Sequence, residues 1–298
     1  MALYGAIEAG GTKFVCLVAS DVTHILAEVT IPTGDPGPTL SSVAGFFQRA
    51  TAGAGAQLDA LGLGCFGPLD VHPESPTFGT ITSTPKVPWR GFNIRQALQT
   101  ALKAPVFLDT DVNAAALGEA TWGAARGLTD FLYLTVGTGV GGGALVNGRP
   151  LHGLTHAEMG HVLLPHDLTR DPFPGVCPYH GDCFEGLASG PALRARWGQD
   201  PEDLPEGHPG WQLEARYIAQ ALMDFVLTLS PQKVILGGGV MHQRQLFPLI
   251  RSDLLDLLRG YVQSPAILDQ MDEYVVPPGL GDRSGVLGAL ALAMQGSR

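Results

Sequence analysis

The chain has 298 residues, which is enough for two ordinary domains with buried cores. Hydrophobic residues make up 45% and charged residues 15%, a composition typical of a globular protein and not of a disordered one. The net charge of −10, with 18 Lys and Arg residues, argues against general nucleic-acid binding, which needs a basic surface.

Nothing in the sequence predicts export or membrane insertion. The first residues, MALYGAIEAGG, lack the charged and apolar regions of a signal peptide, and no apolar run approaches the ~20 residues of a membrane span. We therefore expect a cytoplasmic protein that stays out of the membrane. Four cysteines do not form a disulfide framework in that compartment. Cys16 and Cys65 lie in apolar segments and are expected to be buried, whereas Cys177 and Cys183 need another explanation.

Strands and helices alternate along the chain, which predicts α/β domains with mixed sheets. A strand–glycine turn–strand pattern at 131–146 repeats the one at 3–18, so we expect a duplicated domain with a boundary near 121–129. The predicted elements are strands at 3–7, 14–18 and 25–31, a helix at 40–50, a strand from 58, a helix at 93–102, a strand at 105–111, a helix from 111, the pattern at 131–146, a helix at 213–229, a strand at 233–236, and helices at 246–262 and 284–294.

Three glycine-rich turns, GGTK (10–13), GTGVGGG (137–143) and GGGV (237–240), each follow an apolar strand. Successive N–H groups in such turns form concave anion sites, and glycine lets the backbone approach a ligand closely. Thr12 and Thr138 add hydroxyl donors, and Lys13 adds charge. One such turn alone is most simply a hairpin turn, but three favour nucleotide phosphate binding. None matches a P-loop or a dinucleotide-binding fingerprint.

Acidic residues lie beside two of the apolar strands. Asp109 and Asp111 follow a strand and precede a helix, where α/β proteins place functional groups. One of the two can be a helix cap, and we assign the functional role to Asp111 and the structural role to Asp109. Glu8 interrupts an apolar strand just before a glycine turn. Because a buried carboxylate is costly without a partner, we expect Mg²⁺ or Lys13 beside it.

In the segment CPYHGDC, two residues separate Cys177 from His180, and two more separate His180 from Cys183. Thiolate and imidazole are the ligands that Zn²⁺ prefers in closed, tetrahedral structural sites. The alternatives are a redox pair or unrelated surface residues, and the compartment disfavours a disulfide. We favour zinc, with a fourth ligand from upstream. The upstream candidates are His152, His156, His161 and His166.

Six segments together resemble the ROK family (repressor, open reading frame, kinase) of sugar kinases, most closely its bacterial fructokinase branch. The segments, which occur in this order, are EAGGTK, DTDVNAAALGE, GTGVGGG, HAEMGH, CPYHGDCFEGLASGP and LGGGV. The resemblance covers nearly the whole chain. It implies an actin-like, hexokinase-like ATPase fold of two α/β domains with a cleft between them. The domains would be residues 1–120, joined by the C-terminal helix at 280–298, and residues 121–279.

The resemblance also implies the roles of individual residues. The family transfers the ATP γ-phosphoryl group to a sugar hydroxyl, with Asp111 as the base and Mg²⁺ bound with ATP near Glu8. It implies one structural Zn²⁺ per chain, with His161 as the fourth ligand beside Cys177, His180 and Cys183. The implied sugar-binding residues are Gly67, Thr110, Asp111, Glu158, His161 and Glu185. The implied nucleotide-binding residues are Gly10, Gly11, Thr12, Lys13, Thr138, Gly139, Gly238 and Gly239.

Two departures from the family pattern bear on the substrate. Family kinases commonly have Asp at the position of Glu8, whereas the fructokinase-like members share the Glu. Thr110 stands where many family glucokinases have Asn, so one hydroxyl replaces an amide and a sugar other than glucose is favoured. The prediction is therefore phosphorylation of D-fructose at its 6-hydroxyl. Mannokinase, glucokinase or broad-specificity hexokinase activity is the alternative.

Two readings outside the kinases are disfavoured. A sugar-responsive repressor needs a helix-turn-helix segment before the first strand, and the strand expected from Leu3 leaves no room for one. A non-catalytic sugar-binding protein does not explain Asp111 and the glycine turns. The resemblance further suggests a homodimer.

Overall fold

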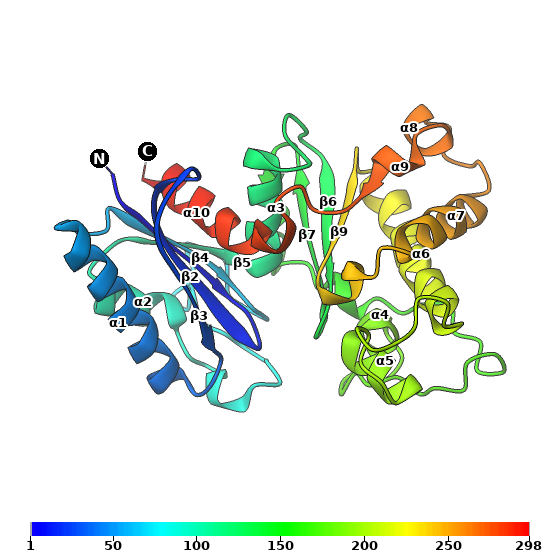
Figure 1. The fold of residues 1–298 in the computed structure, drawn as a ribbon, viewed down its shortest axis with the longest axis horizontal. Helices are drawn as coiled ribbons and strands as arrows, with labels where there is room; N and C mark the ends of the chain where they lie inside the picture. The colour runs from blue at the N-terminus through cyan, green and yellow to red at the C-terminus, as the bar shows by residue number, and fades with distance from the viewer. Residues whose placement is uncertain (1, 298) are drawn as a thin grey trace. The chain divides into compact units, whose positions relative to one another are not determined.

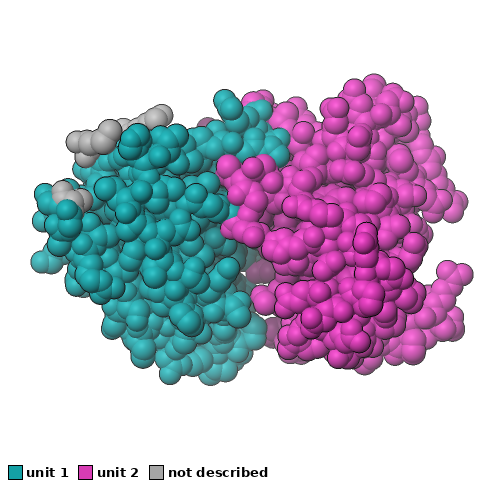
Figure 2. Space-filling view, viewed as in Figure 1, with its two compact units in different colours: residues 1–126, 150–157, 283–298 teal, residues 127–149, 158–282 magenta. Residues whose placement is uncertain are grey.

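Two mixed β-sheets form the framework of the chain in the computed structural model, which describes residues 2–297. Unit 1 comprises residues 1–126, 150–157 and 283–298, and unit 2 comprises residues 127–149 and 158–282 (Figure 2). Residues 150–157 therefore group with unit 1, although they lie in the range predicted for the second domain.

The sheet of unit 1 has the strand order β3-β2-β1-β4-β5. The first three strands pair antiparallel, and β1, β4 and β5 run parallel. The bounds are β1 Tyr4–Ala9, β2 Lys13–Asp21, β3 His24–Pro32, β4 Ala60–Cys65 and β5 Val106–Thr110. Every residue of β4 is buried, as expected for a parallel strand covered on both faces, whereas the edge strand β3 alternates between partly buried and exposed residues.

Helices cover both faces of this sheet (Figure 1). The helices α1 and α2 lie on one face, and α3 and α10 pack together on the other. Their bounds are α1 Pro36–Ala54, α2 Ile94–Leu102, α3 Asp111–Trp122 and α10 Ser284–Gly296, with the short η1 at Val87–Trp89. The helix expected at 40–50 begins earlier because Pro36 occupies its first turn, where the fixed φ of proline suits a helix.

Glycines allow α10 to approach its neighbours closely. A Cβ atom on Gly288 would lie 1.7 Å from the Ala114 carbonyl oxygen of α3, and one on Gly62 would lie 1.7 Å from the Ala289 carbonyl oxygen. Any side chain at these positions would separate the elements. The glycines of α10 and β4 therefore fix the height of α3, which carries Asp111, above the sheet.

The sheet of unit 2 has the strand order β10-β9-β6-β7-β8, with β6 and β7 antiparallel and β6, β9 and β10 parallel. The strands are β6 Phe131–Val136, β7 Val140–Val146, β8 Arg149–Pro150, β9 Val234–Gly237 and β10 Val275–Val276. The helices are η2 Met159–His161, α4 Phe184–Ala188, α5 Gly190–Trp197, α6 Gly210–Leu229, η3 Gly239–His242, α7 Leu246–Leu258, α8 Pro265–Leu268, α9 Met271–Tyr274 and η4 Gly281–Arg283.

Backbone conformation ends α7 sooner than the apolar pattern predicts. The sequence pattern continues to residue 262, but Arg259 and Gly260 adopt positive φ angles of 47° and 68°. Left-handed residues terminate α-helices, and glycine adopts this conformation without steric cost. Across residues 2–297, none of the helices combines the length and the apolar character needed to cross a bilayer.

Candidate active site and metal centre

The predicted base, Asp111, lies in the first turn of α3, directly after the parallel strand β5. The hydroxyl of Thr110 caps the helix by accepting the N–H of Asn113 at 3.1 Å, and Thr110 is buried. Asp111 is partly exposed, and its Oδ1 accepts the Val112 N–H at 2.9 Å. A Cβ atom on Gly64 would lie 3.3 Å from the Asp111 Cα, so glycine in β4 permits this close packing. Asp111 therefore presents its carboxylate at the carboxyl end of the parallel strand β5.

Asp109 is a buried acceptor beside the base. Its Oδ1 accepts the Thr110 N–H at 2.7 Å and the Asn113 Nδ2 at 2.9 Å, and it lies 3.0 Å from Nε2 of His152. Sequence reasoning considered Asp109 as the helix cap, but Thr110 caps α3, and Asp109 instead accepts hydrogen bonds from the start of that helix. No sequence signal pointed to its contact with His152, 43 residues away. The pair places an imidazole beside the first turn of α3.

The first glycine turn of unit 1 joins β1 to β2. The Gly10 N–H donates to the Lys13 carbonyl at 3.0 Å, and the side chains of Thr12 and Lys13 are exposed. Thr33, which follows β3, fixes the turn, because its hydroxyl donates to the Gly10 carbonyl at 2.8 Å. The turn thus holds Thr12 and Lys13 at the surface, available to a phosphate.

The carboxylate of Glu8 lies against the first turn of α10. A Cβ atom on Gly285 would lie within 2.6 Å of both Glu8 carboxylate oxygens, so only glycine leaves room for this group. The positive end of a helix dipole stabilises a carboxylate there. The sequence predicted Lys13 or Mg²⁺ as the partner of Glu8 and did not foresee α10, because residues 8 and 285 are far apart in the chain.

The two glycine turns of unit 2 lie next to each other. A Cβ atom on Gly137 would lie 3.4 Å from the Gly239 N atom. The Gly137 carbonyl accepts the Gly190 N–H at the start of α5, at 2.7 Å. Gly238 has a φ of 91° and packs on Val136, a close contact that also requires glycine. The exposed Thr138 is therefore carried on a turn fixed from three elements of this unit.

Three predicted sugar-binding residues of unit 2 come together. Glu185 of α4 accepts the Val140 N–H through Oε2 at 3.0 Å, so it also anchors the turn that holds Gly139. Glu158 is an exposed residue, but partial burial of its carboxyl group raises its pKa. The nearby His161 lowers this pKa, and the charge of Glu185 raises it. Both groups therefore lie within electrostatic range of Glu158.

His161, Cys177, His180 and Cys183 form a cluster whose ligand atoms all lie within 4.8 Å of one another. The His161 Nδ1 is 3.5 Å from the Cys183 Sγ and 3.7 Å from the Cys177 Sγ, and the His180 Nδ1 is 3.8 Å from the Cys177 Sγ. Zn–S bonds of about 2.3 Å and Zn–N bonds of about 2.0 Å give a tetrahedron with S···N edges of about 3.5 Å. The spacing and the donor types therefore fit Zn²⁺.

The cluster is built from tight local turns. Cys177 and Gly181 exchange two backbone hydrogen bonds, of 3.1 and 2.9 Å, and Gly181 has a φ of 67°. Burial, together with the neighbouring Cys177, raises the pKa of the Cys183 thiol to about 11. A Cys183 thiolate is therefore disfavoured unless a cation is bound, and both cysteines are free of disulfides.

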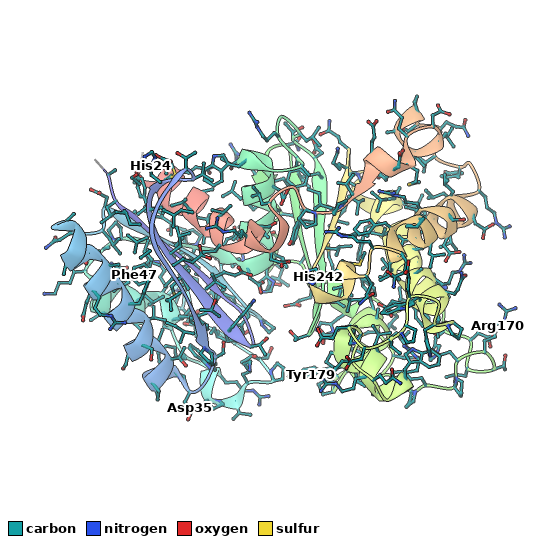
Figure 3. The ribbon with its side chains drawn as sticks, viewed as in Figure 1. His24, Asp35, Phe47, Arg170, Tyr179 and His242 are labelled. Atoms are coloured by element: carbon teal, nitrogen blue, oxygen red, sulfur yellow. The ribbon has the colours of Figure 1, made fainter. Side chains whose placement is uncertain are left out.

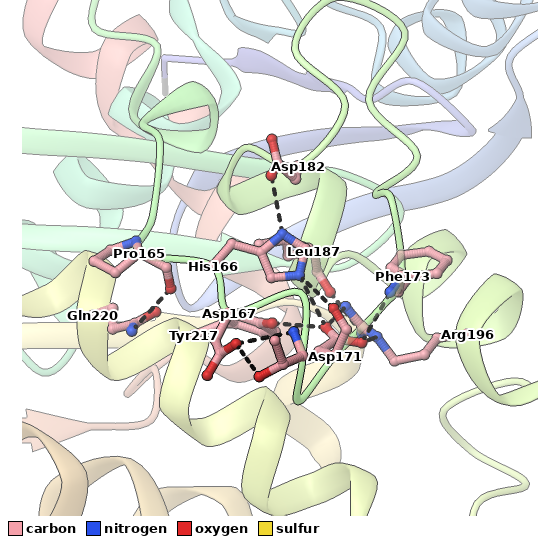
Figure 4. Close-up of polar contacts among 11 residues, drawn as sticks. Pro165, His166, Asp167, Asp171, Phe173, Asp182, Leu187, Arg196, Tyr217 and Gln220 are labelled. Atoms are coloured by element: carbon pink, nitrogen blue, oxygen red, sulfur yellow. Dashed lines mark hydrogen bonds and ion pairs between the residues drawn. The ribbon is translucent and has the colours of Figure 1, made fainter.

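His166, another upstream candidate for the fourth ligand, belongs to a separate polar network (Figure 4). Its Nδ1 lies 3.0 Å from Asp182, and its Nε2 lies 2.9 Å from the Asp171 carbonyl. The buried Asp171 carboxylate forms an ion pair with Arg196 of α5 at 3.1 Å and accepts the Tyr217 hydroxyl of α6 at 2.7 Å. The network therefore ties the segment between His161 and Cys183 to two helices. Sequence reasoning identified none of these contacts.

Glu214 of α6 is also buried, and its carboxyl oxygens have no hydrogen-bond partner among the described residues. Burial raises its pKa well above the usual value, and Arg196 opposes that rise. The folded state therefore keeps a proton that the unfolded state loses above a pKa of about 4.3. Stability contributed by this group is complete below that pH and is lost progressively as the pH rises toward the raised pKa.

We expect Glu214→Gln to remove this loss, because glutamine resembles the neutral acid. Relative to wild type, the free energy of unfolding should rise by up to about 1.4 kcal/mol for each pH unit above the unfolded pKa. Urea unfolding at pH 5.5 and pH 8 measures the difference. Glu206→Gln, which changes an exposed glutamate of unit 2, is the control and should leave the pH dependence unchanged. Equal slopes for wild type and Glu214→Gln would show that Glu214 is ionised in the folded protein.

A hollow of about 190 Å³ adjoins the third glycine turn. Gly237 and Gly238 line it, with Met241, Asp282 and His242, which is labelled in Figure 3. The His242 Nε2 lies 2.8 Å from the Asp282 Oδ1. Sequence reasoning named Gly238 and Gly239 here but missed His242 and Asp282, because a single histidine and aspartate carry no motif.

Comparison with known proteins agrees with the geometry of both units. A fructokinase of Pediococcus pentosaceus is 43% identical over 291 residues, covering 98% of this chain and 97% of the relative. The ROK hexokinase of Thermus thermophilus has 32% identity and a TM-score of 0.78, covering 99% of this chain and 98% of that one. A ROK family glucokinase from Streptomyces griseus, solved with glucose and AMPPNP, has 26% identity and a TM-score of 0.75, covering 99% of this chain and all of that one.

These likenesses confirm the predicted α/β fold of the actin-like, hexokinase-like ATPase type, with two mixed sheets and helices. They also confirm the resemblance seen in the six sequence segments, since the model of the ROK family matches residues 4–296. The chain therefore belongs to the ROK family.

Proposed function

We propose that this protein is an ATP-dependent fructokinase, which transfers the ATP γ-phosphoryl group to the 6-hydroxyl of D-fructose. The observation that carries the chemistry is Asp111, a partly exposed carboxylate in the first turn of α3, at the carboxyl end of β5. The observation that supports fructose is the 43% identity to a protein named as a fructokinase, against 26% to one named as a glucokinase.

Asp111 acts as the general base in this proposal. It accepts the proton of the sugar 6-hydroxyl as the oxygen attacks the γ-phosphorus, and the bond to ADP breaks. Proton transfer to a positioned carboxylate contributes typically 10²–10⁴-fold to a rate. Most of the remaining catalysis comes from positioning and from stabilising charge on the phosphates, as in other phosphoryl transfers.

The glycine turns bind the nucleotide. Gly10, Gly11, Thr12 and Lys13 of unit 1 and Thr138 and Gly139 of unit 2 contact the β- and γ-phosphates, and Gly238 and Gly239 line the nucleotide. Support comes from the exposed side chains of Thr12, Lys13 and Thr138, and from the close packing of the two turns in unit 2. Bound Mg²⁺ supplies charge neutralisation on the phosphates, and Glu8 is its proposed protein neighbour.

The sugar is held by Glu158, His161 and Glu185 of unit 2 and by Gly67, Thr110 and Asp111 of unit 1. The electrostatic influence of His161 and Glu185 on Glu158 supports this assignment. The carboxylate oxygens of Glu158 and Glu185 can accept hydrogen bonds from the hydroxyls of the sugar.

The cluster of two cysteines and two histidines binds one structural Zn²⁺ per chain. The Nδ1 of His161 faces the cluster, which leaves Nε2 for a sugar hydroxyl. A metal ligand that uses its second nitrogen for substrate is oriented by the metal. The ion therefore shapes the sugar site without taking part in the reaction. The family resemblance supports a homodimer, and a cytoplasmic location is part of the proposal.

The testing experiment is a coupled ADP-release assay with Mg·ATP against fructose, mannose and glucose. We expect the highest kcat/KM on fructose. Comparable values on all three hexoses would replace the proposal with a broad-specificity hexokinase, and a preference for mannose or glucose would overturn the choice of sugar. Sugar binding without turnover on any hexose would identify a non-catalytic sugar-binding protein.

A further inference from the structure

Thr110, which departs from the family pattern next to Asp111, already has a structural role in the fold. Thr110 is buried, and its hydroxyl accepts the Asn113 N–H to cap α3. A short, buried side chain with this commitment is a poor candidate for discriminating between sugars. Recognition of a sugar hydroxyl beside Asp111 then needs another polar group near the carboxyl end of β5 in unit 1.

His152 is such a group. Its Nε2 lies 3.0 Å from the Asp109 Oδ1 and 3.3 Å from the Asn113 Nδ2, while one third of its side chain is exposed. The side chain of Asp109 is only 5% exposed. It also accepts the N–H of Thr110, which is the residue immediately before Asp111. The imidazole therefore rests on the same buried carboxylate that packs beneath the first turn of α3.

The segment that carries His152 is anchored to unit 1 at two further points. The Nε2 of His156 accepts the Leu69 N–H at 3.0 Å, and a nitrogen of His72 lies 2.9 Å from the Leu154 carbonyl. Both contacts hold the chain just after His152, and with the contact to Asp109 they orient its ring before any ligand binds. Preorganised polar groups lose less entropy on binding than mobile ones.

The contacts also define the chemistry of the ring. A carboxylate accepts a hydrogen bond, so Nε2 of His152 carries a proton and Nδ1 remains for another partner. The hydrogen bond to Asp109 raises the pKa of His152, and partial burial opposes the rise. The nearby His156 accepts a hydrogen bond through Nε2, and its burial lowers its pKa. The imidazole of His152 thus donates through Nε2 to Asp109, two residues before Asp111.

We propose that His152 is a sugar-binding residue that contacts a hydroxyl of the hexose next to the one deprotonated by Asp111, and that Asp109 is the positioning residue for its ring. The inference rests on the proposed kinase function and adds a specificity determinant to it. The sequence assigned discrimination between sugars to Thr110, and this inference assigns it to His152.

The test compares wild type with His152→Ala, His152→Gln and the matched control His24→Ala. His24 is also a histidine of unit 1 paired with an aspartate, Asp21, but it lies on the exposed β3 strand (Figure 3). We expect His152→Ala to raise the KM for fructose roughly 10- to 100-fold, the range for a lost hydrogen bond to a polar or charged group. kcat and the KM for ATP should stay close to wild type.

His152→Gln should recover part of the loss, because an amide can donate to Asp109 and still reach a hydroxyl. His24→Ala should match wild type throughout. An unchanged KM for fructose in His152→Ala, with the Tm and the KM for ATP preserved, overturns the inference. A loss of kcat and of ATP affinity together, not rescued by glutamine, also overturns it, because that result indicates a structural role.

Calorimetric titration of the same variants with fructose, mannose and glucose separates this inference from the proposed function. If wild type phosphorylates no hexose but binds one, the kinase proposal fails, and weaker binding by His152→Ala alone still supports the sugar contact. If wild type neither binds nor phosphorylates any of these sugars, both proposals are overturned.

Discussion

Asp111→Asn is expected to lower kcat with fructose by roughly 10²–10⁴-fold while the fold and the binding of ATP survive. The variant keeps an oxygen that can accept the Val112 N–H but has no carboxylate to take the hydroxyl proton. Since Asp111 is partly exposed, the substitution leaves no cavity in the core. Steady-state kinetics with the coupled assay measures kcat, and thermal unfolding with and without ATP checks the fold.

Asp35 offers a matched control for this experiment. It also stands at the N-terminus of a helix of unit 1, α1, and is exposed without capping the helix through its side chain. Asp35→Asn should therefore keep wild-type turnover. Turnover of Asp111→Asn within a few-fold of the control would remove Asp111 from the role of base.

Cys183→Ser is expected to release zinc from the cluster and to destabilise the segment around it. Cys183 is fully buried and lies within 3.5 Å of His161, so a hydroxyl there is a weaker ligand in a site that cannot rearrange freely. A structural zinc ion contributes on the order of 10 kcal/mol to local folding. Losing it should lower the Tm by at least about 10 °C. Elemental analysis of the purified protein gives the zinc content directly.

The zinc prediction includes an effect on the sugar. Because His161 is both a proposed metal ligand and a proposed sugar contact, the metal-free variant should lose affinity for fructose more than for ATP. Cys16→Ala, which changes a buried cysteine outside the cluster, should keep about one zinc per chain. A full zinc complement in Cys183→Ser would contradict the ligand set, and a wild-type protein without zinc would contradict the metal itself.

The sequence by itself determined the order of elements and most of the chemistry-bearing segments. Signals within a few residues were enough for this: glycine turns between apolar strands predicted the hairpins β1–β2 and β6–β7. CPYHGDC likewise carries three candidate metal ligands within seven residues. Proline and left-handed residues shifted helix ends by a few positions, which apolar periodicity cannot register. The combination of six segments was enough to indicate the ROK family, which the family model confirms.

Only the tertiary structure decided which distant residues share an environment. His152 reaches Asp109 across 43 residues, and the Glu8 carboxylate lies against Gly285 near the other end of the chain. Glu185 was predicted to bind sugar, and the structure adds its hydrogen bond to Val140. These contacts depend on how strands and helices pack, because a close approach requires glycine on one element and a polar group on another. Neither partner carries a local signal that names the other, so the pairs emerge only when the chain is folded.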